Sequence, residues 1–249
     1  MYPCKQLLSI LLIVSFAIGF SCCDKNQIGG PIGHETPKTY SESSNGSTNK
    51  DNFGIDISHH NGVINWKKVA GTTSLLFVYI KATEGSNYVD PLYHNNLRDA
   101  KENGFKVGSY HFFRMTSSAH GQFDNFKKNV DSTKQDLIPM VDVETNDNHS
   151  NKELRDSLNV FIDLIKLHYG HAPMIYATNK SYNQLCGGLY GSYHLYIGRY
   201  GKNPPSLKGK GKYTIWQYTE NAKIDGIPKP VDKAIFNEEY TISDILLRK

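Results

Sequence analysis

Two carboxylates lie close together at 140–144, where the sequence reads MVDVE. At positions i and i+2 of a β-strand, Asp142 and Glu144 project to the same side, while the two valines face the opposite side. Two strand rises separate the carboxylates by about 6.5 to 7 Å. At this spacing in a partly dry site, one carboxyl group keeps its proton near neutral pH while the other stays ionised. Such a pair supplies the acid and the supporting carboxylate that hydrolysis of a glycosidic bond requires.

Taken alone, an Asp-x-Glu pair is weak support for catalysis, because it occurs by chance in many proteins. A solvated or salt-bridged strand end is the more frequent explanation. The other polar residues that end apolar strands are therefore informative, since a series of them is harder to explain by chance than any single one. They are Asp56, Ser58, Lys81, Thr83, Tyr110, His111, Tyr176, Arg199, Trp216 and Gln217.

Alternating strands and helices must position these residues. Short β-branched or apolar runs predict strands at 53–58, 75–83, 106–113, 137–145, 173–178, 194–200, 213–219 and 231–236. Helical spacing predicts helices at 92–100, 117–130 and 152–168, with the last ended by Gly170. About five β-α units followed by three strands predict an α/β barrel of mostly parallel strands. In such barrels the catalytic groups lie at the carboxyl ends of the strands.

The composition favours one large globular domain. Of 249 residues, 39% are hydrophobic and 12% aromatic, and so many rings require a packed core. The formal net charge of +4, from 28 basic and 24 acidic residues, is too mild to indicate a nucleic-acid-binding protein. His59, His60 and His111 lack the spacing typical of a zinc site, so we expect no metal.

The N-terminal residues 1–22 are interpreted as a secretory signal. Their apolar run of about fourteen residues is shorter than the roughly 20 needed to span a bilayer. Small residues directly before Cys22 and Cys23 resemble the bacterial lipoprotein signal, in which Cys22, or alternatively Cys23, carries the lipid. An ordinary cleaved signal is the alternative. We therefore expect an exported protein anchored to the cell envelope by a lipid, or else a secreted one.

Residues 23–50 are polar and rich in Gly, Ser and Asn. They bury too little apolar surface to fold, which predicts a flexible tether to a catalytic domain at 51–249. Within that domain Cys186 is the remaining cysteine, so no disulfide framework is available. We expect this domain to be a monomer.

Five motifs follow one another along the chain and include the acid pair. They are GIDISHHNGVINW at 54–66, IKATEG at 80–85, VGSYHFF at 107–113, VDVE at 141–144 and IWQY at 215–218. Together they resemble glycoside hydrolase family 25, the N-acetylmuramidases first known as Chalaropsis-type lysozymes, over about residues 51–240. The resemblance implies a flattened TIM-like barrel that acts on the glycan strands of peptidoglycan. The bond cleaved would be the β-1,4 bond between N-acetylmuramic acid and N-acetylglucosamine, without a cofactor.

Matching positions carry over the roles of individual residues. The resemblance implies that Glu144 is the general acid. Asp142 would stabilise the transition state or orient the acetamido group of the substrate, and Asp56 would position the sugar or water. The residues expected to line the sugar groove are Lys81, Tyr110, Phe112, Tyr176, Trp216 and Asp232, since aromatic faces stack on sugars and lysine can meet a carbonyl or acidic group.

Less specific interpretations remain for some of these residues. Asp56 could instead be a turn or helix-cap acid. Tyr176 and Trp216 could be partly core residues even if their edges reach a sugar, since large rings bury most of their area. Two alternative functions also remain: a non-catalytic peptidoglycan-binding surface lipoprotein, and a hydrolase of another N-acetylhexosamine polymer such as chitin. Retention of both Asp142 and Glu144 favours an enzyme over a binding protein.

Overall fold

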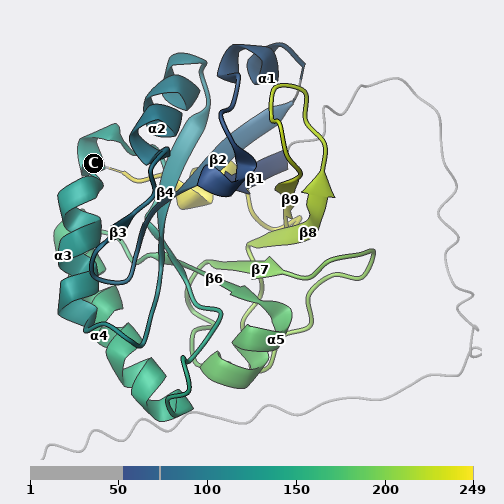
Figure 1. Cartoon of the computed structure of the whole chain (residues 1–249). Coiled ribbons are helices and arrows are strands. Elements are labelled where there is room, and N and C mark those ends of the chain that lie inside the picture. The colour runs from purple at the N-terminus through teal and green to yellow at the C-terminus, as the bar shows by residue number, and fades with distance from the viewer. Residues whose placement is uncertain (1–52, 73, 249) are drawn as a thin grey trace, which may run out of the picture. The chain divides into compact units, whose positions relative to one another are not determined.

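Eight strands close into a barrel in the computed structural model, which describes residues 53–72 and 74–248 (Figure 1). The strand order is β1-β9-β8-β7-β6-β5-β4-β2, and β1 pairs with β2 to close the circle. A ninth strand, β3, pairs with the end of β2 outside the barrel. The strands are β1 Phe53–Ile57, β2 Leu75–Glu84, β3 Tyr88–Val89, β4 Lys106–Phe112, β5 Met140–Asp142, β6 Met174–Thr178, β7 Leu195–Gly198, β8 Ile215–Ala222 and β9 Val231–Phe236.

Each of the first five barrel strands leads into a helix. The helices are α1 Trp66–Thr72, α2 Tyr93–Glu102, α3 Ala119–Asn129, α4 Asn151–Tyr169 and the single turn α5 Asn179–Ser181. Figure 1 shows α2, α3 and α4 along one side of the barrel. The strands β1, β2 and β4 to β8 run parallel, whereas β9 is antiparallel to both β8 and β1. The predicted barrel of five β-α units followed by three strands is confirmed.

The longest helix, α4, is specified by signals at both of its ends. Ser150 accepts a hydrogen bond from the backbone of Glu153, whose side chain in turn accepts from the backbone of Ser150, which forms a capping box. Gly170 ends the helix in the left-handed region at φ 73°. Between these ends a stripe of buried residues faces the barrel, including Leu154, Leu158, Phe161, Ile162 and Ile165.

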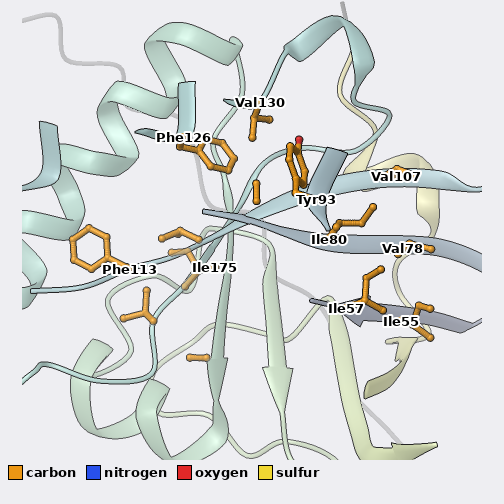
Figure 2. Packing of buried hydrophobic residues seen from close by; sticks show 14 of the residues in the cluster. Ile55, Ile57, Val78, Ile80, Tyr93, Val107, Phe113, Phe126, Val130 and Ile175 are labelled. Atoms are coloured by element: carbon orange, nitrogen blue, oxygen red, sulfur yellow. The ribbon is translucent and has the colours of Figure 1, made fainter. Parts of the chain in front are cut away.

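Alternation along the strands divides the core into two layers. The outward layer lies between the barrel and its helices, and Figure 2 shows part of it, including Ile55, Ile57, Val78, Ile80, Val107 and Ile175. The inward layer fills the barrel itself with rings and methionines, including Phe77, Tyr79, Met140, Met174, Tyr176 and Tyr196. The apolar run of β2 supplies residues to both layers, which explains why it shows no alternation.

The C-terminal segment closes the amino ends of the barrel strands. The backbone N–H of Ile138 donates to the carbonyl of Ile245, and Leu137 forms an antiparallel bridge with Leu246. Ile245 and Leu247 are buried in the inward layer. Because this end is filled, the carboxyl ends of the strands form the open mouth.

One strand prediction was too long. The segment 137–145 was expected to be a single strand, but β5 contains only Met140–Asp142. Leu137 and Ile138 pair with the C-terminal segment instead, and Pro139 has no N–H to donate to a ladder. The expectation that both carboxylates lie within the strand is therefore wrong for Glu144, which follows its end.

The three predicted helices are confirmed within a few residues of their bounds. The short elements α1, α5 and β3 were not predicted, because each has too few residues to show a period. The expected signal at 1–22, the lipid site at Cys22 or Cys23 and the tether at 23–50 lie outside the described residues. Among residues 53–72 and 74–248, no helix has the length and apolar character needed to cross a membrane.

Candidate active site

A cavity of about 530 Å³ opens at the carboxyl ends of the barrel strands. Eight of the nine predicted catalytic and sugar-binding residues line it: Asp56, Lys81, Tyr110, Phe112, Asp142, Glu144, Tyr176 and Asp232. The lining also includes Ser58, His60, Asn61, Met140, Tyr200, Gln217, Glu220, Lys229 and Pro230. The cavity therefore gathers four of the predicted acids, from β1, β9, the end of β5 and the residues just after it.

Asp142 and Glu144 share the cavity but differ in their surroundings. Val143 between them is fully buried in the outward layer, so the alternation that places both carboxylates on the cavity side continues past the end of β5. Asp142 is buried, and its Oδ1 atom has no hydrogen-bond partner. Glu144 is half-buried. The deeper carboxyl group thus offers a free acceptor atom, whereas the shallower one remains in contact with solvent.

Both carboxyl groups bind protons more tightly than an exposed acid does. Burial raises the pKa of Asp142 well above its ordinary value, and the charges of Glu144 and Asp56 raise it further. Burial also raises the pKa of Glu144, as does the charge of Asp56, against the opposing effects of Tyr176, Lys81 and Arg114. The pair therefore retains a proton at a higher pH than two isolated carboxylates would.

Asp56 is held by side chains from two distant strands. Its Oδ2 atom accepts a 2.6 Å hydrogen bond from the hydroxyl of Tyr196 and a 2.9 Å bond from the amide of Gln217. The amide oxygen of Gln217 accepts in turn from Tyr176 at 2.9 Å. Burial raises the pKa of Asp56, and the hydrogen bonds from Tyr196 and Gln217 partly offset this effect. The turn after β1 is capped by Ser58 instead, so the cap interpretation of Asp56 is wrong.

Asp232 lies directly opposite Asp56 in the antiparallel pairing of β1 and β9. Burial, followed by the charges of Asp56 and Glu220, raises the pKa of Asp232 to about 8. Side chains directly opposite each other on the same face of a sheet are close neighbours, so two carboxylates in this arrangement repel when both are ionised.

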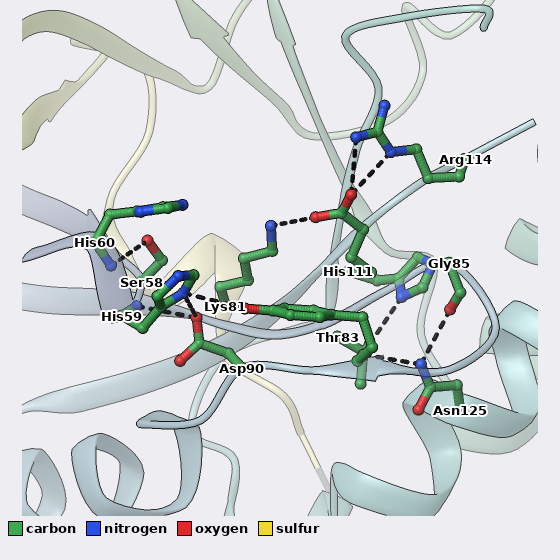
Figure 3. Close-up of polar contacts among 12 residues, drawn as sticks. Ser58, His59, His60, Lys81, Thr83, Gly85, Asp90, His111, Arg114 and Asn125 are labelled. Atoms are coloured by element: carbon green, nitrogen blue, oxygen red, sulfur yellow. Dashed lines mark hydrogen bonds and ion pairs between the residues drawn. The ribbon is translucent and has the colours of Figure 1, made fainter.

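Lys81 is a basic residue in the lining of this acidic cavity. Its Nζ atom donates to Oε2 of Glu84 at 2.6 Å (Figure 3). The same atom lies 4.9 Å from the ring centroid of Phe112. The charge of Lys81 lowers the pKa of both Asp142 and Glu144. The positive charge of Lys81 thus opposes the effect of burial, which raises the pKa values of Asp142 and Glu144.

Trp216 does not line the cavity. Alternation in β8 directs Gln217 toward Asp56 inside the barrel, so Trp216 faces the other side, where its indole N–H donates to the carbonyl of Arg199 at 2.7 Å. The aromatic residue that the structure adds to the cavity is Tyr200, which follows β7.

Several cavity residues and contacts were missed by the sequence analysis. Glu84 and Gln217 stood within recognised motifs without a role, and Tyr196 fell in a predicted strand whose alternation could have placed it inside the barrel. Tyr200 ended the strand predicted at 194–200, a position that the strand-end rule could have selected. Glu220 and Lys229 showed no signal, because the pairing of distant strands and loops brings them to the mouth. Among the described residues, no group of three or more His, Cys, Asp or Glu side chains is arranged to hold a metal ion.

In α/β barrel enzymes the catalytic groups lie at the carboxyl ends of the strands, and glycoside hydrolases use a pair of carboxyl groups as their catalytic residues. The chain belongs to glycosyl hydrolases family 25, whose family model matches residues 55–227, and it is a glycoside hydrolase.

Individual relatives agree with this assignment. The chain is similar to the uncharacterized protein YegX of Escherichia coli strain K12, with 33% identity over 188 residues that cover 74% of this chain and 69% of YegX. It is similar to lysozyme M1 of Streptomyces globisporus, with 32% identity over 198 residues that cover 74% of this chain and 67% of that enzyme. Its fold is similar to that of a family 25 glycosyl hydrolase from Bacillus anthracis, with a TM-score of 0.70, 31% identity, and coverage of 81% of this chain and 97% of the other.

Proposed function

We propose that this protein is a muramidase that cleaves the β-1,4 bond between N-acetylmuramic acid and N-acetylglucosamine in peptidoglycan. The observation that carries this proposal is the cavity at the barrel mouth, where Asp142 and Glu144 lie together with raised pKa values. Hydrolysis of a glycosidic bond needs one protonated and one ionised carboxyl group. Similarity to lysozyme M1 supports peptidoglycan as the polymer.

In the proposed mechanism, Glu144 is the general acid. A general acid must recover a proton from solvent after each turnover, and half-buried Glu144 is the more accessible of the pair. Its raised pKa keeps it protonated at a higher pH than an exposed glutamate. It would donate this proton to the oxygen of the leaving sugar.

Asp142 would orient the acetamido group of the bound sugar and support positive charge at the anomeric carbon. Its unpartnered Oδ1 atom is an acceptor that an amide N–H of the substrate can satisfy. A hydrogen bond from substrate would favour the ionised form of Asp142 and leave the shared proton on Glu144. Asp56 and Asp232, on the neighbouring strands, would position the sugar or water.

The remaining predicted groove residues have chemistry suited to sugar binding. Tyr110, Phe112 and Tyr176 place aromatic groups around the cavity, and Lys81 adds a donor beside the acids. The four predicted acids in the cavity favour turnover over a role in wall binding alone. A polymer that lacks muramic acid is the competing substrate for the same groove.

We further propose that the chain is exported and held at the cell envelope by a lipid on Cys22 or Cys23, with peptidoglycan within reach of the tethered domain. The proposal depends on the signal-like sequence of residues 1–22 and on the polar composition of residues 23–50. Labelling of the chain with a fatty acid in a bacterial host tests it, and an exported chain without label would favour simple secretion.

Glu144→Gln tests the proposed acid. The amide has the shape of the carboxyl group but cannot donate the proton, so the release of reducing ends from purified peptidoglycan should fall by about 10²- to 10⁴-fold. Glu102→Gln, at the exposed end of α2, is the matched control and should retain full activity. Unchanged activity in Glu144→Gln would show that another group is the acid.

The products identify the substrate. Mass spectrometry of the released fragments should find muramic acid at the reducing end, and pure N-acetylglucosamine oligomers should be cleaved much more slowly. Equal or faster cleavage of the pure oligomers would identify a different polymer.

A further inference from the structure

Arg114 follows β4 and connects two segments that carry groups of the cavity. Figure 3 shows the first of its two contacts, with Glu84. Arg114 is not itself among the residues that line the cavity. Its guanidinium group contacts Glu84 at the end of β2 and Asp147 in the loop after β5. Arg114 therefore joins the strand that carries Lys81 to the loop that carries Glu144.

The first contact orients Lys81. Nε and Nη2 of Arg114 lie 2.9 and 2.8 Å from Oε1 of Glu84, while Lys81 donates to Oε2 of the same carboxylate at 2.6 Å. The Arg114 guanidinium and the Lys81 ammonium also lie 4.8 and 4.9 Å from the ring centroid of Phe112. Glu84 thus has one oxygen for each cation, and Arg114 fixes the carboxylate to which Lys81 is bound.

The second contact holds the loop that follows Glu144. Nη1 of Arg114 lies 3.2 Å from Oδ1 of Asp147, and Oδ2 of Asp147 accepts from the backbone of Met115 at 2.9 Å. Asp147 and Asn148 both have positive φ, at 46° and 68°. Aspartate and asparagine adopt the left-handed conformation more readily than other non-glycine residues, and surrounding contacts can fix them in it. The contacts of Arg114 and Met115 with Asp147 are such constraints.

Buried contacts fix the backbone of Arg114 itself. Gln122 of α3 accepts from the N–H of Arg114 at 2.8 Å and donates to its carbonyl at 2.7 Å. The same Gln122 is 3.0 Å from Nε2 of His111, whose Nδ1 is 2.8 Å from the hydroxyl of Thr83. Because Gln122, His111 and Thr83 are fully buried, the base of the Arg114 side chain has a defined position.

We propose that Arg114 is a positioning residue for the reaction, which holds Lys81 through Glu84 and holds the loop of Glu144 through Asp147. The proposal rests on the muramidase function with Glu144 as the acid. Loss of Arg114 would release both contacts together, so the proton donor and the nearby cation would lose their mutual geometry. Misplacement of reacting groups by about 1 Å can cost on the order of 10²-fold in rate.

Arg114 also acts on the acid through its charge. The titratable groups that interact with Glu144 across the cavity are Asp56 from β1, Lys81 from β2, Asp142 from β5, Tyr176 from β6, Tyr200 after β7 and Asp232 from β9. Together with Lys81, Arg114 lowers the pKa of Glu144 against the raising effect of burial and of Asp56. Removal of this positive charge should move the titration of Glu144 to higher pH, which a purely structural role would not do.

Arg114→Gln, Arg114→Lys and Arg155→Gln in the full chain test the proposal. Arg155 of α4 donates to the carbonyl of Leu185 outside the cavity and is the matched control. Arg114→Gln should lower kcat on peptidoglycan by about 10- to 100-fold with KM changed less than about threefold, and should shift the alkaline limb of the pH profile upward. Arg114→Lys keeps the charge, so it should recover part of kcat and the wild-type alkaline limb, whereas Arg155→Gln should leave both unchanged.

A titration without substrate completes the test. The carboxyl ¹³C resonance of Glu144, followed by NMR, should titrate at higher pH in Arg114→Gln than in wild type. Wild-type kcat in Arg114→Gln, or a loss of kcat with the alkaline limb and the Glu144 titration unchanged, would overturn the positioning role. If wild type releases no reducing ends, the proposed function fails, and if Glu144→Gln keeps its activity, another group is the acid. In either case an unshifted Glu144 titration in Arg114→Gln overturns the role of Arg114 separately.

Discussion

Replacement of Asp232 by asparagine should stabilise the folded protein, and increasingly so as the pH rises. In the folded chain, burial and the charges of Asp56 and Glu220 raise the pKa of Asp232 from its ordinary 3.8 to about 8. Between these two values the unfolded chain has released the proton while the folded chain retains it. The unfolded state therefore binds fewer protons, so the free energy of unfolding falls with increasing pH in this range. An asparagine side chain cannot ionise, so the free energy of unfolding of the variant does not include this decrease with pH.

The size of the effect follows from the difference of about four pH units between the two pKa values. At about 1.4 kcal/mol for each unit, the upper limit is on the order of 5 kcal/mol. Asp232 is only partly buried and contacts the cavity, where solvent screens the repulsion, so we expect about half of that limit. A gain of about 2 kcal/mol corresponds to a rise of roughly 4 to 8 °C in Tm for a domain of this size.

Urea unfolding at pH 4.5, 6, 7.5 and 9 measures this difference. The stability of Asp232→Asn relative to wild type should rise from pH 4.5 to about pH 8 and then remain constant. Asp124→Asn, on the exposed face of α3, is the control and should follow wild type throughout. A pH-independent difference, or one that grows toward acid pH, would refute the explanation by repulsion and burial.

Two further substitutions test the interior below the cavity. Tyr196→Phe removes the 2.6 Å hydrogen bond to Asp56, a bond that favours the ionised form of this carboxyl group. The substitution should cost about 1.5 to 3 kcal/mol where Asp56 is ionised and less at lower pH where it is protonated, measured by urea unfolding across the pH range; a cost that does not change with pH would contradict this. Gly54→Ala would place a Cβ atom 2.0 Å from the ring of Phe77, so the variant should lose at least about 1 to 3 kcal/mol or accumulate as insoluble protein. A Gly54→Ala chain with wild-type Tm would show that the ring can move aside.

The sequence was sufficient to predict the barrel because its signals are local. The apolar run of β2 and the capped, amphipathic α4 each show their type within one window of residues. Parallel strands present functional groups at their carboxyl ends, and this rule alone predicts that Asp56, Lys81 and Asp142 lie together. All three line the cavity.

The contacts that support the acids could not be predicted in this way. Asp56 and Tyr196 are 140 positions apart, and nothing near either residue indicates that one hydrogen bond joins them. The link through Arg114 depends on two loops whose residues have no periodic pattern. Trp216 shows the opposite case: its motif was recognised, but the alternation within β8 directs Gln217 into the barrel, and Trp216 is not among the residues that line the cavity.

Asp56 and Asp142 both line the cavity, but their hydrogen bonds differ, and this difference suggests different roles for the two residues. Asp56 already accepts from Tyr196 and Gln217 through Oδ2, so a substrate donor would have to compete with existing partners there. Asp142 has an oxygen with no partner, and the cost of leaving a buried acceptor unpaired is recovered only when a donor arrives. A substrate amide would therefore gain more at Asp142 than at Asp56, which makes Asp142 the residue expected to orient the acetamido group and Asp56 a carboxyl group held in place beside it by Tyr196 and Gln217.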